Sequence, residues 1–427
     1  MRKLFVVVIL ATCGIASMCF AGGQREKSAA TKSKIVFYAP TWGEEYAKQV
    51  FKLYMAEKPN VEIENIGGPS VWQDHLTRTQ LWMSTKYAGV DIQYQDDVFT
   101  LDGASQGVWE ELGQHMTQAQ KDDLVDVQKE YARLHGGIYR IPWWQGMSYN
   151  YYRKDILKRE GLAVPQTWAE LLSTGQKLTR DLNGDGTIDQ WGYTTQGYPT
   201  EMKINFLEFL WQNGGDDWTL FTGGQPDPKA KGALEYMVEL FRKTTSTDWP
   251  AIHYNESRAL LREGRAVIER DWADPGRMIA AEGLSDVIGV MNFPAGPAGP
   301  WGTAGCWGIV VNKYGANFKK DKDVVIDFAL YFMRPEIHKI VAVIDAPALK
   351  SVWKDTAYLE RELYPKNVAA RHAAEFLPWR HVRKLPAGRG AEYGEEYGKL
   401  IIKCVSGEVD VPTTLKNIQQ LINPWIK

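Results

Sequence analysis

The pattern of apolar and polar positions divides the chain after residue 33 into alternating strand-like and helix-like segments. Apolar, β-rich runs occupy residues 34–40, 61–66 and 90–95. Between these runs, apolar residues recur at helical spacing from Ala47 onward and again over 71–84. The order strand, helix, strand, helix, strand predicts a parallel sheet with crossover helices, and therefore an α/β fold.

Helices predominate in the middle of the chain. Thr167 and Glu170 form the capping-box pattern of a helix that extends to about Leu178. Helical periodicity follows at 206–212, 230–243 and 321–333. Strand patterns return at 287–293 and 307–312. Glycine- and proline-rich segments near Ile141 and Phe293 predict two places where the chain passes between lobes.

The composition is that of a globular protein without a nucleic-acid partner. The chain has 427 residues, of which 24% are charged and 44% hydrophobic, which predicts two or three domains. The formal net charge of −2 at pH 7 lacks the basic footprint of a nucleic-acid binder. Two cysteines remain after the leader, Cys306 and Cys404, and whether they form a disulfide stays open.

The N-terminal residues have the pattern of an export signal. Residues 1–21 start with Arg2 and Lys3, continue with an apolar stretch and end on small residues, as signal peptides do. Residues 22–33 are polar and predict a flexible tether. We therefore expect an exported protein, periplasmic or anchored to the outer face of the cytoplasmic membrane. Cys19 as a lipidated cysteine is the open alternative for anchoring.

Four motifs resemble, in order, the extracellular solute-binding proteins of carbohydrate ABC importers. The longest is "GGIYRIPWWQGMSYNYYRKDIL" at 136–157, which continues into "PQTWAELL". The others are "VDIQYQDDVF" with Asp97, "REGRAVIERDW" with Trp272, and "GTAGCWGIVVNKY" with Gly305 and Trp307. The resemblance extends from about residue 34 to about residue 347. Within the family, the sequence is similar to the trehalose/maltose-binding branch.

The resemblance implies a two-lobed periplasmic-binding-protein-like fold of type II, with the ligand cleft between the lobes. It implies a first lobe of residues 34–141 plus 301–344, and a second lobe of 142–300 plus 345–427. A protein of this kind captures a mono- to oligosaccharide and delivers it to ABC importer permease subunits in the membrane. We expect such a binding component to be a monomer, to catalyse no reaction and to require no cofactor.

The resemblance also implies which residues contact a sugar. A pyranose ring offers apolar C–H faces to aromatic rings and a rim of hydroxyls to carboxylates and amides. The residues carried over from the family pattern are Trp42, Glu44, Asp97, Trp144, Trp272, Asp274, Gly305 and Trp307. For two neighbours we expect a structural role: Trp143 in the core, and Asp96 as a solvated or capping carboxylate.

The chain departs from the family pattern at four places. Gly146 stands where an acidic residue is expected, and Asp274 stands where an aromatic residue is expected. Cys306 replaces a glycine, and the Arg-Pro pattern expected near 376–379 is missing. Because a site that hydrogen-bonds hydroxyl groups discriminates strongly, these departures leave the identity of the sugar open.

A second motif, "DLNGDGTIDQWG" at 181–192, matches the start of a calcium-binding loop. Its candidate ligands are Asp181, Asn183, Asp185, Thr187 and Asp189. The twelfth position, which an EF-hand fills with glutamate, is Gly192. Structural Ca²⁺ is one interpretation of this loop, and an Asx-turn stabilised by its own side chains is the other.

Other function classes remain as alternatives. A secreted glycoside hydrolase needs two carboxylates across one bond, for which Asp97 with Asp274 or Glu44 are the candidates. No local motif pairs them, and the strand–helix pattern does not repeat as in a barrel. A calcium-organised adhesin would carry repeated Asp-rich loops. A binder of a polyol or glycerophosphodiester is a further alternative, although the motifs contain no Arg/Lys cluster that calls for phosphate.

Overall fold

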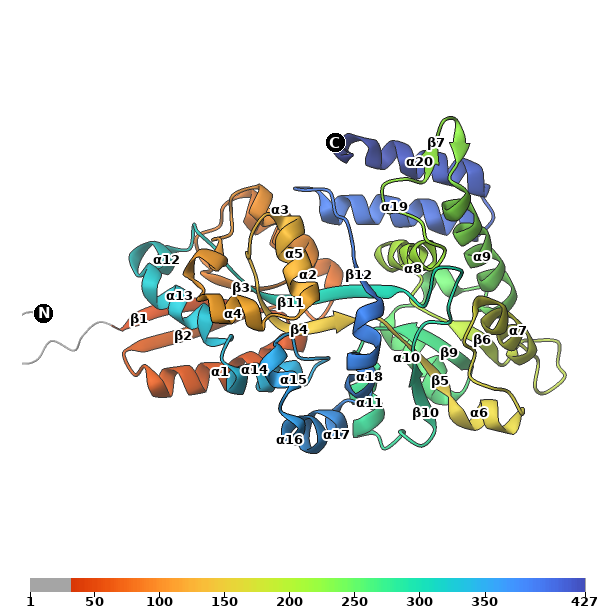
Figure 1. Ribbon diagram of the computed structural model, residues 1–427, viewed down its shortest axis with the longest axis horizontal. Helices are drawn as coiled ribbons and strands as arrows, with labels where there is room; N and C mark the ends of the chain where they lie inside the picture. The colour runs from red at the N-terminus through yellow and green to blue at the C-terminus, as the bar shows by residue number, and fades with distance from the viewer. Residues whose placement is uncertain (1–31, 427) are drawn as a thin grey trace, which may run out of the picture.

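The structure, a computed structural model, describes residues 32–426 as two lobes joined by strands (Figure 1). The predicted signal peptide, Cys19 and most of the predicted tether lie outside the described residues. Within residues 32–426, no helix is both long and apolar enough to cross a membrane.

The first lobe is built on a mixed sheet in the order β12-β11-β3-β1-β2, with β4 paired to β11. Its strands are β1 (Ser33–Ala39), β2 (Val61–Gly67), β3 (Ile92–Asp96), β4 (Ile141–Met147), β11 (Gly302–Val311) and β12 (Arg380–Val382). The strand β1 pairs in parallel with both β2 and β3, as the sequence pattern predicted. The strand β11 then adds antiparallel partners, β3 on one side and β4 on the other.

Helices cover this sheet because their apolar residues recur every three or four positions. In α1 the buried residues Ala47, Val50, Phe51 and Tyr54 form one stripe that packs in the core around β1. The helices of this lobe are α1 (Thr41–Glu57), α2 (Trp72–Ser84), α3 (Asp97–Ser105), α4 (Gln118–Asp123), α5 (Asp126–His135), α12 (Ala316–Lys320), α13 (Lys322–Tyr331), α14 (Pro335–Ala342), α15 (Lys350–Trp353), α16 (Thr356–Tyr358) and α17 (Tyr364–Lys366).

The second lobe is built on a four-stranded sheet in the order β10-β5-β9-β6. Its strands are β5 (Tyr149–Arg153), β6 (Trp191–Thr194), β9 (Ala266–Asp271) and β10 (Ile288–Met291), and a separate hairpin pairs β7 (Phe221–Thr222) with β8 (Gln225–Pro226). Its helices are α6 (Lys154–Arg159), α7 (Trp168–Leu178), α8 (Pro199–Gln212), α9 (Pro228–Thr244), α10 (Tyr254–Glu263), α11 (Asp274–Ala281), α18 (Ala370–Phe376), α19 (Gly390–Val405) and α20 (Val411–Ile422). The predicted capping box of Thr167 and Glu170 is present at the start of α7.

The chain crosses between the lobes in strands that lie side by side (Figure 1). The strand β4 belongs to the first sheet and is followed, after Ser148, by β5 of the second. The strands β4 and β11 approach closely: an ideal Cβ on Gly146 would lie 1.6 Å from the carbonyl oxygen of Gly305. A side chain at position 146 would push the two crossing strands apart, which explains why the expected acidic residue is absent.

The C-terminal part differs from the predicted division, which assigns all of 345–427 to the second lobe. Val352, Tyr358 and Leu363 pack in the core of the first lobe, and β12 pairs with β11 of the first sheet. The helices α19 and α20 then pack in the core of the second lobe. The chain therefore crosses between the lobes again, between β12 and α19.

Candidate functional site

Asp97 lies where the chain leaves β3 and begins α3, at the carboxyl end of the strand. Its side chain is 1% exposed and accepts two hydrogen bonds from Nη2 of Arg383, at 2.6 and 2.7 Å, and one from the Tyr131 hydroxyl at 3.0 Å. Arg383 follows β12 and was not predicted from the sequence. The only indication in the sequence was the Arg-Pro pattern of the family, which is expected near 376–379, a few positions earlier in the chain.

The pKa values of the adjacent carboxyl groups of Asp96 and Asp97 are shifted in opposite directions. Burial raises the pKa of Asp97, but the charges of Arg383 and Arg140 and the hydrogen bonds from Arg383 and Tyr131 outweigh burial and hold it below the ordinary value. Burial and the neighbouring Asp97 charge raise the pKa of Asp96 to about 7. Asp96 caps α3 by accepting the backbone N–H of Phe99, so the expected capping role is confirmed.

An aromatic cluster surrounds Trp307, which stands opposite Asp96 in the register of β11 and β3. The Trp307 ring stacks on Tyr94 with ring centroids 4.9 Å apart and meets the edges of Trp42 and Trp72 at 5.6 Å each. Trp42 and Trp307 were predicted as ligand contacts, whereas Trp72 at the start of α2 was not. The structure therefore brings Trp42 and Trp307 together at one end of the first sheet.

The adjacent tryptophans of β4 are both buried. Trp143 is fully enclosed and stacks on Phe332 at 5.2 Å, in agreement with the predicted core role. Trp144 stands opposite Trp307 in the register of β4 and β11 and lies 5.4 Å from the Tyr94 ring. Because only 5% of Trp144 is exposed, its ring contributes to the core behind the cluster in this structure.

Trp272 reaches the crossing strands from the second lobe. It follows β9, and its indole N–H donates to both carboxylate oxygens of Glu201 at 3.1 and 3.2 Å. The guanidinium carbon of Arg270 lies 4.7 Å from the ring centroid, over one face. A Cβ on Gly305 would lie 3.1 Å from a ring carbon of Trp272, so the glycine leaves room for the indole. Trp272, Gly305 and Asp97 thus surround Arg383, which lies 3.9 Å from the same Cβ position.

A buried ion network supports Trp272. Arg270 is fully buried and donates to Glu208 at 2.7 and 2.9 Å and to Glu201 at 2.7 Å. Glu208 also accepts the backbone N–H of Thr303 in β11 at 3.1 Å. Sequence analysis missed this network because its members are separated along the chain and carry no motif. The network connects the indole to a strand that crosses between the lobes.

Glu44 and Asp274 are engaged with side chains other than Asp97. Glu44 accepts from Asn65 at 2.8 Å and pairs with Lys48 at 2.6 Å. Asp274, at the start of α11, lies 3.5 Å from Arg258 and 3.7 Å from Arg277.

The two helices that carry these acids, α1 and α11, are nevertheless in contact across the lobes. Nη1 of Arg277 in α11 donates to the Tyr46 hydroxyl of α1 at 2.6 Å. The contact places Glu44 and Asp274 on the two sides of the junction between the lobes.

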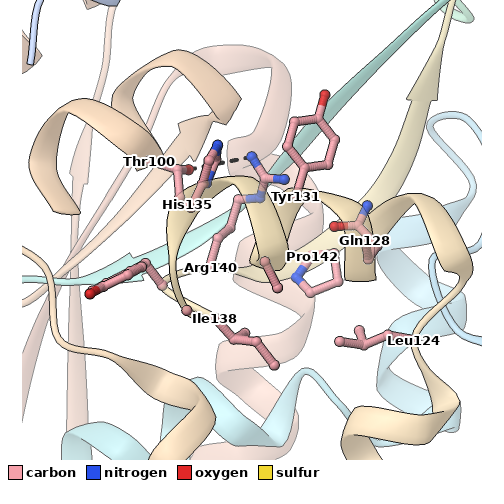
Figure 2. Close-up of a pocket in the computed structure, with 11 residues that line it drawn as sticks. Thr100, Leu124, Gln128, Tyr131, His135, Ile138, Arg140 and Pro142 are labelled. Carbon is pink, nitrogen blue, oxygen red and sulfur yellow. Dashed lines mark hydrogen bonds between the residues drawn. The ribbon is translucent and has the colours of Figure 1, made fainter. Parts of the chain in front are cut away.

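A small, partly open pocket lies between α5 and β4 (Figure 2). Tyr131 lines it and connects it to Asp97. Arg140 also lines it and donates to the Thr100 hydroxyl at 3.3 Å and to the Cys306 carbonyl oxygen at 3.1 Å. The pocket is therefore linked to Asp97 through Tyr131, which lies on α5 of the first lobe.

The predicted calcium loop connects α7 to β6 and is exposed. Asp181 accepts backbone N–H groups of Asn183, Gly184 and Gly186, at 3.1, 2.6 and 2.7 Å, as in an Asx-turn. Across residues 32–426, no group of three or more His, Cys, Asp or Glu side chains is arranged to hold a metal ion. Structural calcium therefore stays a prediction. Cys306 and Cys404 are both buried and free, so they form no disulfide.

Comparisons with known proteins agree in family and fold. A family model described as "Bacterial extracellular solute-binding protein" matches residues 40–338. A Deinococcus radiodurans protein described as "Probable ABC transporter-binding protein" is 28% identical over 285 residues, which cover 63% of this chain and 65% of that protein, slightly less than two thirds of its length. A "Mannitol-binding protein" of Pseudomonas aeruginosa is 22% identical over 316 residues, 70% of this chain and 72% of that protein.

Solved structures are similar over almost the whole chain. The structure titled "Maltose bound T. maritima MalE3" aligns with a TM-score of 0.75 and 22% identity, covering 91% of this chain and 99% of that one. The structure of UgpB from Mycobacterium tuberculosis in complex with glycerophosphocholine aligns with a TM-score of 0.74 and 17% identity, covering 92% and 99%. These likenesses confirm the two-lobed α/β fold.

Proposed function

Because the chain belongs to the family of bacterial extracellular solute-binding proteins, we propose that it captures a mono- to oligosaccharide between its lobes and delivers it to the permease of an ABC importer. The supporting observation is the meeting of Trp272 with Gly305, Arg383 and Asp97, which come from both sides of the crossing strands. A rigid indole beside a carboxylate and a guanidinium is the combination that a pyranose ring requires.

The surroundings of Trp272 fix how it would meet a sugar. Its N–H is held by Glu201 and one face is covered by Arg270, so a sugar ring would stack on the opposite face. A ring whose orientation is fixed before binding loses little entropy on binding. Asp97 and Arg383 would then exchange part of their mutual hydrogen bonding for ligand hydroxyls.

The relatives support a transport role and leave the ligand class broad. Two of them are described as an ABC transporter-binding protein and a mannitol-binding protein, and the two solved structures hold maltose and glycerophosphocholine. We therefore propose export of the protein and docking of its closed form on permease subunits. Polyols and glycerophosphodiesters belong in the binding tests beside sugars.

Binding is favoured over glycoside hydrolysis by the state of the carboxylates. A hydrolase needs an acid and a second carboxylate free to act on one bond. Asp97 is held by Arg383, Glu44 by Asn65 and Lys48, and Asp274 lies beside two arginines, Arg258 and Arg277. Incubation with an oligosaccharide panel should therefore release no reducing ends, and turnover would favour the hydrolase.

Thermal-shift screening across sugars and polyols tests the proposal, since a ligand that binds only the folded form raises the melting temperature. For the best ligand we expect Trp272→Ala to weaken binding at least about thirtyfold, the usual effect of losing a central tryptophan. Trp379→Ala removes an exposed indole and is the matched control. Equal affinities of wild type and Trp272→Ala would contradict the proposed site.

A further inference from the structure

Lys203 of α8 is a buried lysine without a hydrogen-bond acceptor in the described part of the chain. Its side chain is 3% exposed. Its Nζ lies 4.3 Å from the ring centroid of Tyr393 and 6.0 Å from that of Tyr397, both on α19. A π face offsets only part of the cost of removing an ammonium group from water. Such a group normally has a carboxylate partner, and Lys203 has none within residues 32–426.

Three charged groups act on Lys203, and they lie at or near the junction of the lobes. Burial first, and then the Arg383 charge, lower the pKa of Lys203 to about 7, against the opposite effects of Asp217 and Asp97. Asp97 already accepts two hydrogen bonds from Arg383. The charge with the largest effect on Lys203 is thus a second cation, which repels the ammonium.

Asp217 does not neutralise Lys203 by direct contact either. One of its oxygens accepts the indole N–H of Trp211, and the other accepts the backbone N–H of Lys384 at 2.9 Å. Its effect on Lys203 is that of a charge beyond ion-pair distance.

Arg383 also has donor capacity left. Both of its hydrogen bonds to Asp97 come from Nη2, and its Nε is buried without an acceptor in the described residues. An arginine and a lysine that share one buried region and retain unused N–H donors form the usual surroundings of a carboxylate or phosphate.

We propose that the ligand of this protein carries an anionic group, a carboxylate or a phosphate, which Lys203 and Arg383 receive at the junction of the lobes. The inference rests on the proposed function, because it adds a binding site for the acidic group of a sugar whose ring stacks on Trp272. No motif predicted this pair. The fold assembles it from α8 and from the segment after β12.

The proposed contact makes binding depend on pH with a definite sign. An anion bound beside Lys203 raises its pKa above the ligand-free value of about 7, so binding takes up a proton near neutral pH. The affinity for an acidic ligand is then highest below pH 7 and falls as the pH rises toward 9. The affinity for a neutral sugar lacks this dependence.

Sugars matched in ring and size test the inference: glucose, glucuronate and glucose 6-phosphate form one set, and galactose and galacturonate form the other. Isothermal titration at pH 6.5 should give an acidic member at least about tenfold tighter binding than its neutral counterpart, the usual effect of a charge-assisted hydrogen bond. Comparison of the uronates with the phosphate ester distinguishes a carboxylate from a phosphate. Titration in buffers of different ionisation enthalpy should show proton uptake.

The Lys203→Met variant should abolish the preference for the acidic sugar and the proton uptake, and Lys231→Met on the surface of α9 should change neither. If neutral and acidic sugars bind equally, the anionic ligand is excluded. If Lys203→Met retains the preference, Lys203 is excluded as the group that receives the anion. In both cases the sugar-binding function stands. If no sugar of either kind binds the folded wild type, the proposed function itself fails, and this inference with it.

Discussion

Arg270→Met tests how strongly the buried ion network around Trp272 stabilises the fold. Methionine is similar in length but carries no charge and donates no hydrogen bond. Glu201 would keep the Tyr254 hydroxyl and the Trp272 indole as neutral donors, and Glu208 would keep the backbone N–H of Thr303. Two buried carboxylates would lose their only cation in this network.

The expected cost can be worked out in two ways. Removing one partner of a buried ion pair typically costs about 3–5 kcal/mol. Alternatively, protonating one glutamate of ordinary pKa, about 4.3, at pH 7 costs about 3.7 kcal/mol, because each pH unit is worth about 1.36 kcal/mol. Both routes give a loss of about 4 kcal/mol at pH 7. Because the protonation cost falls with pH, the loss should shrink to about 1 kcal/mol at pH 5.

Urea unfolding of wild type and Arg270→Met, followed by circular dichroism at pH 7 and pH 5, measures both values. Arg133→Met, which breaks an exposed pair with Glu130, is the control and should change the unfolding free energy by less than about 0.5 kcal/mol. A loss below about 1 kcal/mol at pH 7, or an equal loss at both pH values, would refute the reasoning.

Three further predictions concern the crossing strands, the site carboxylate and the loop. Gly146→Ala should destabilise the protein by more than about 3 kcal/mol in thermal or urea unfolding, because its Cβ would overlap the Gly305 carbonyl oxygen; a loss below about 1 kcal/mol would mean that the strands separate easily. Asp97→Asn should weaken ligand binding at least about tenfold in calorimetry, since it removes the counter-charge of Arg383; unchanged affinity would remove Asp97 from the site. Calcium should raise the melting temperature of wild type but not of Asp181→Asn, and equal melting temperatures with calcium and with chelator would favour the Asx-turn alternative.

The local architecture was predictable where one short segment carries the signal. The runs that became β1, β2 and β3 alternate with helical stripes, and their order determines a parallel arrangement. The capping box at Thr167 is likewise read from four residues. Asp97 could be placed in advance because the carboxyl end of a strand in a parallel sheet is a usual position for ligand-binding groups.

The partners of these residues could not be predicted from the sequence. Arg383 is separated from Asp97 by 286 positions and follows a strand of three residues, which has almost no sequence signal. Glu201 and Lys203 lie on one helix, α8, whose residues from Glu201 to Gln212 are all buried. The spacing of its apolar residues therefore does not show which face of the helix meets the site. The motifs contain no Arg/Lys cluster, but Lys203 and Arg383 lie outside them. The charge of the site could therefore not be predicted from the motifs.

Determining the structure of the protein with the best ligand of the thermal-shift screen tests the central claim most directly. The account predicts a ligand held between the two lobes, with its ring on Trp272 and its polar groups on Asp97 and Arg383. A ligand bound on the outer face of either lobe, with Trp272 and Asp97 out of contact, would contradict it.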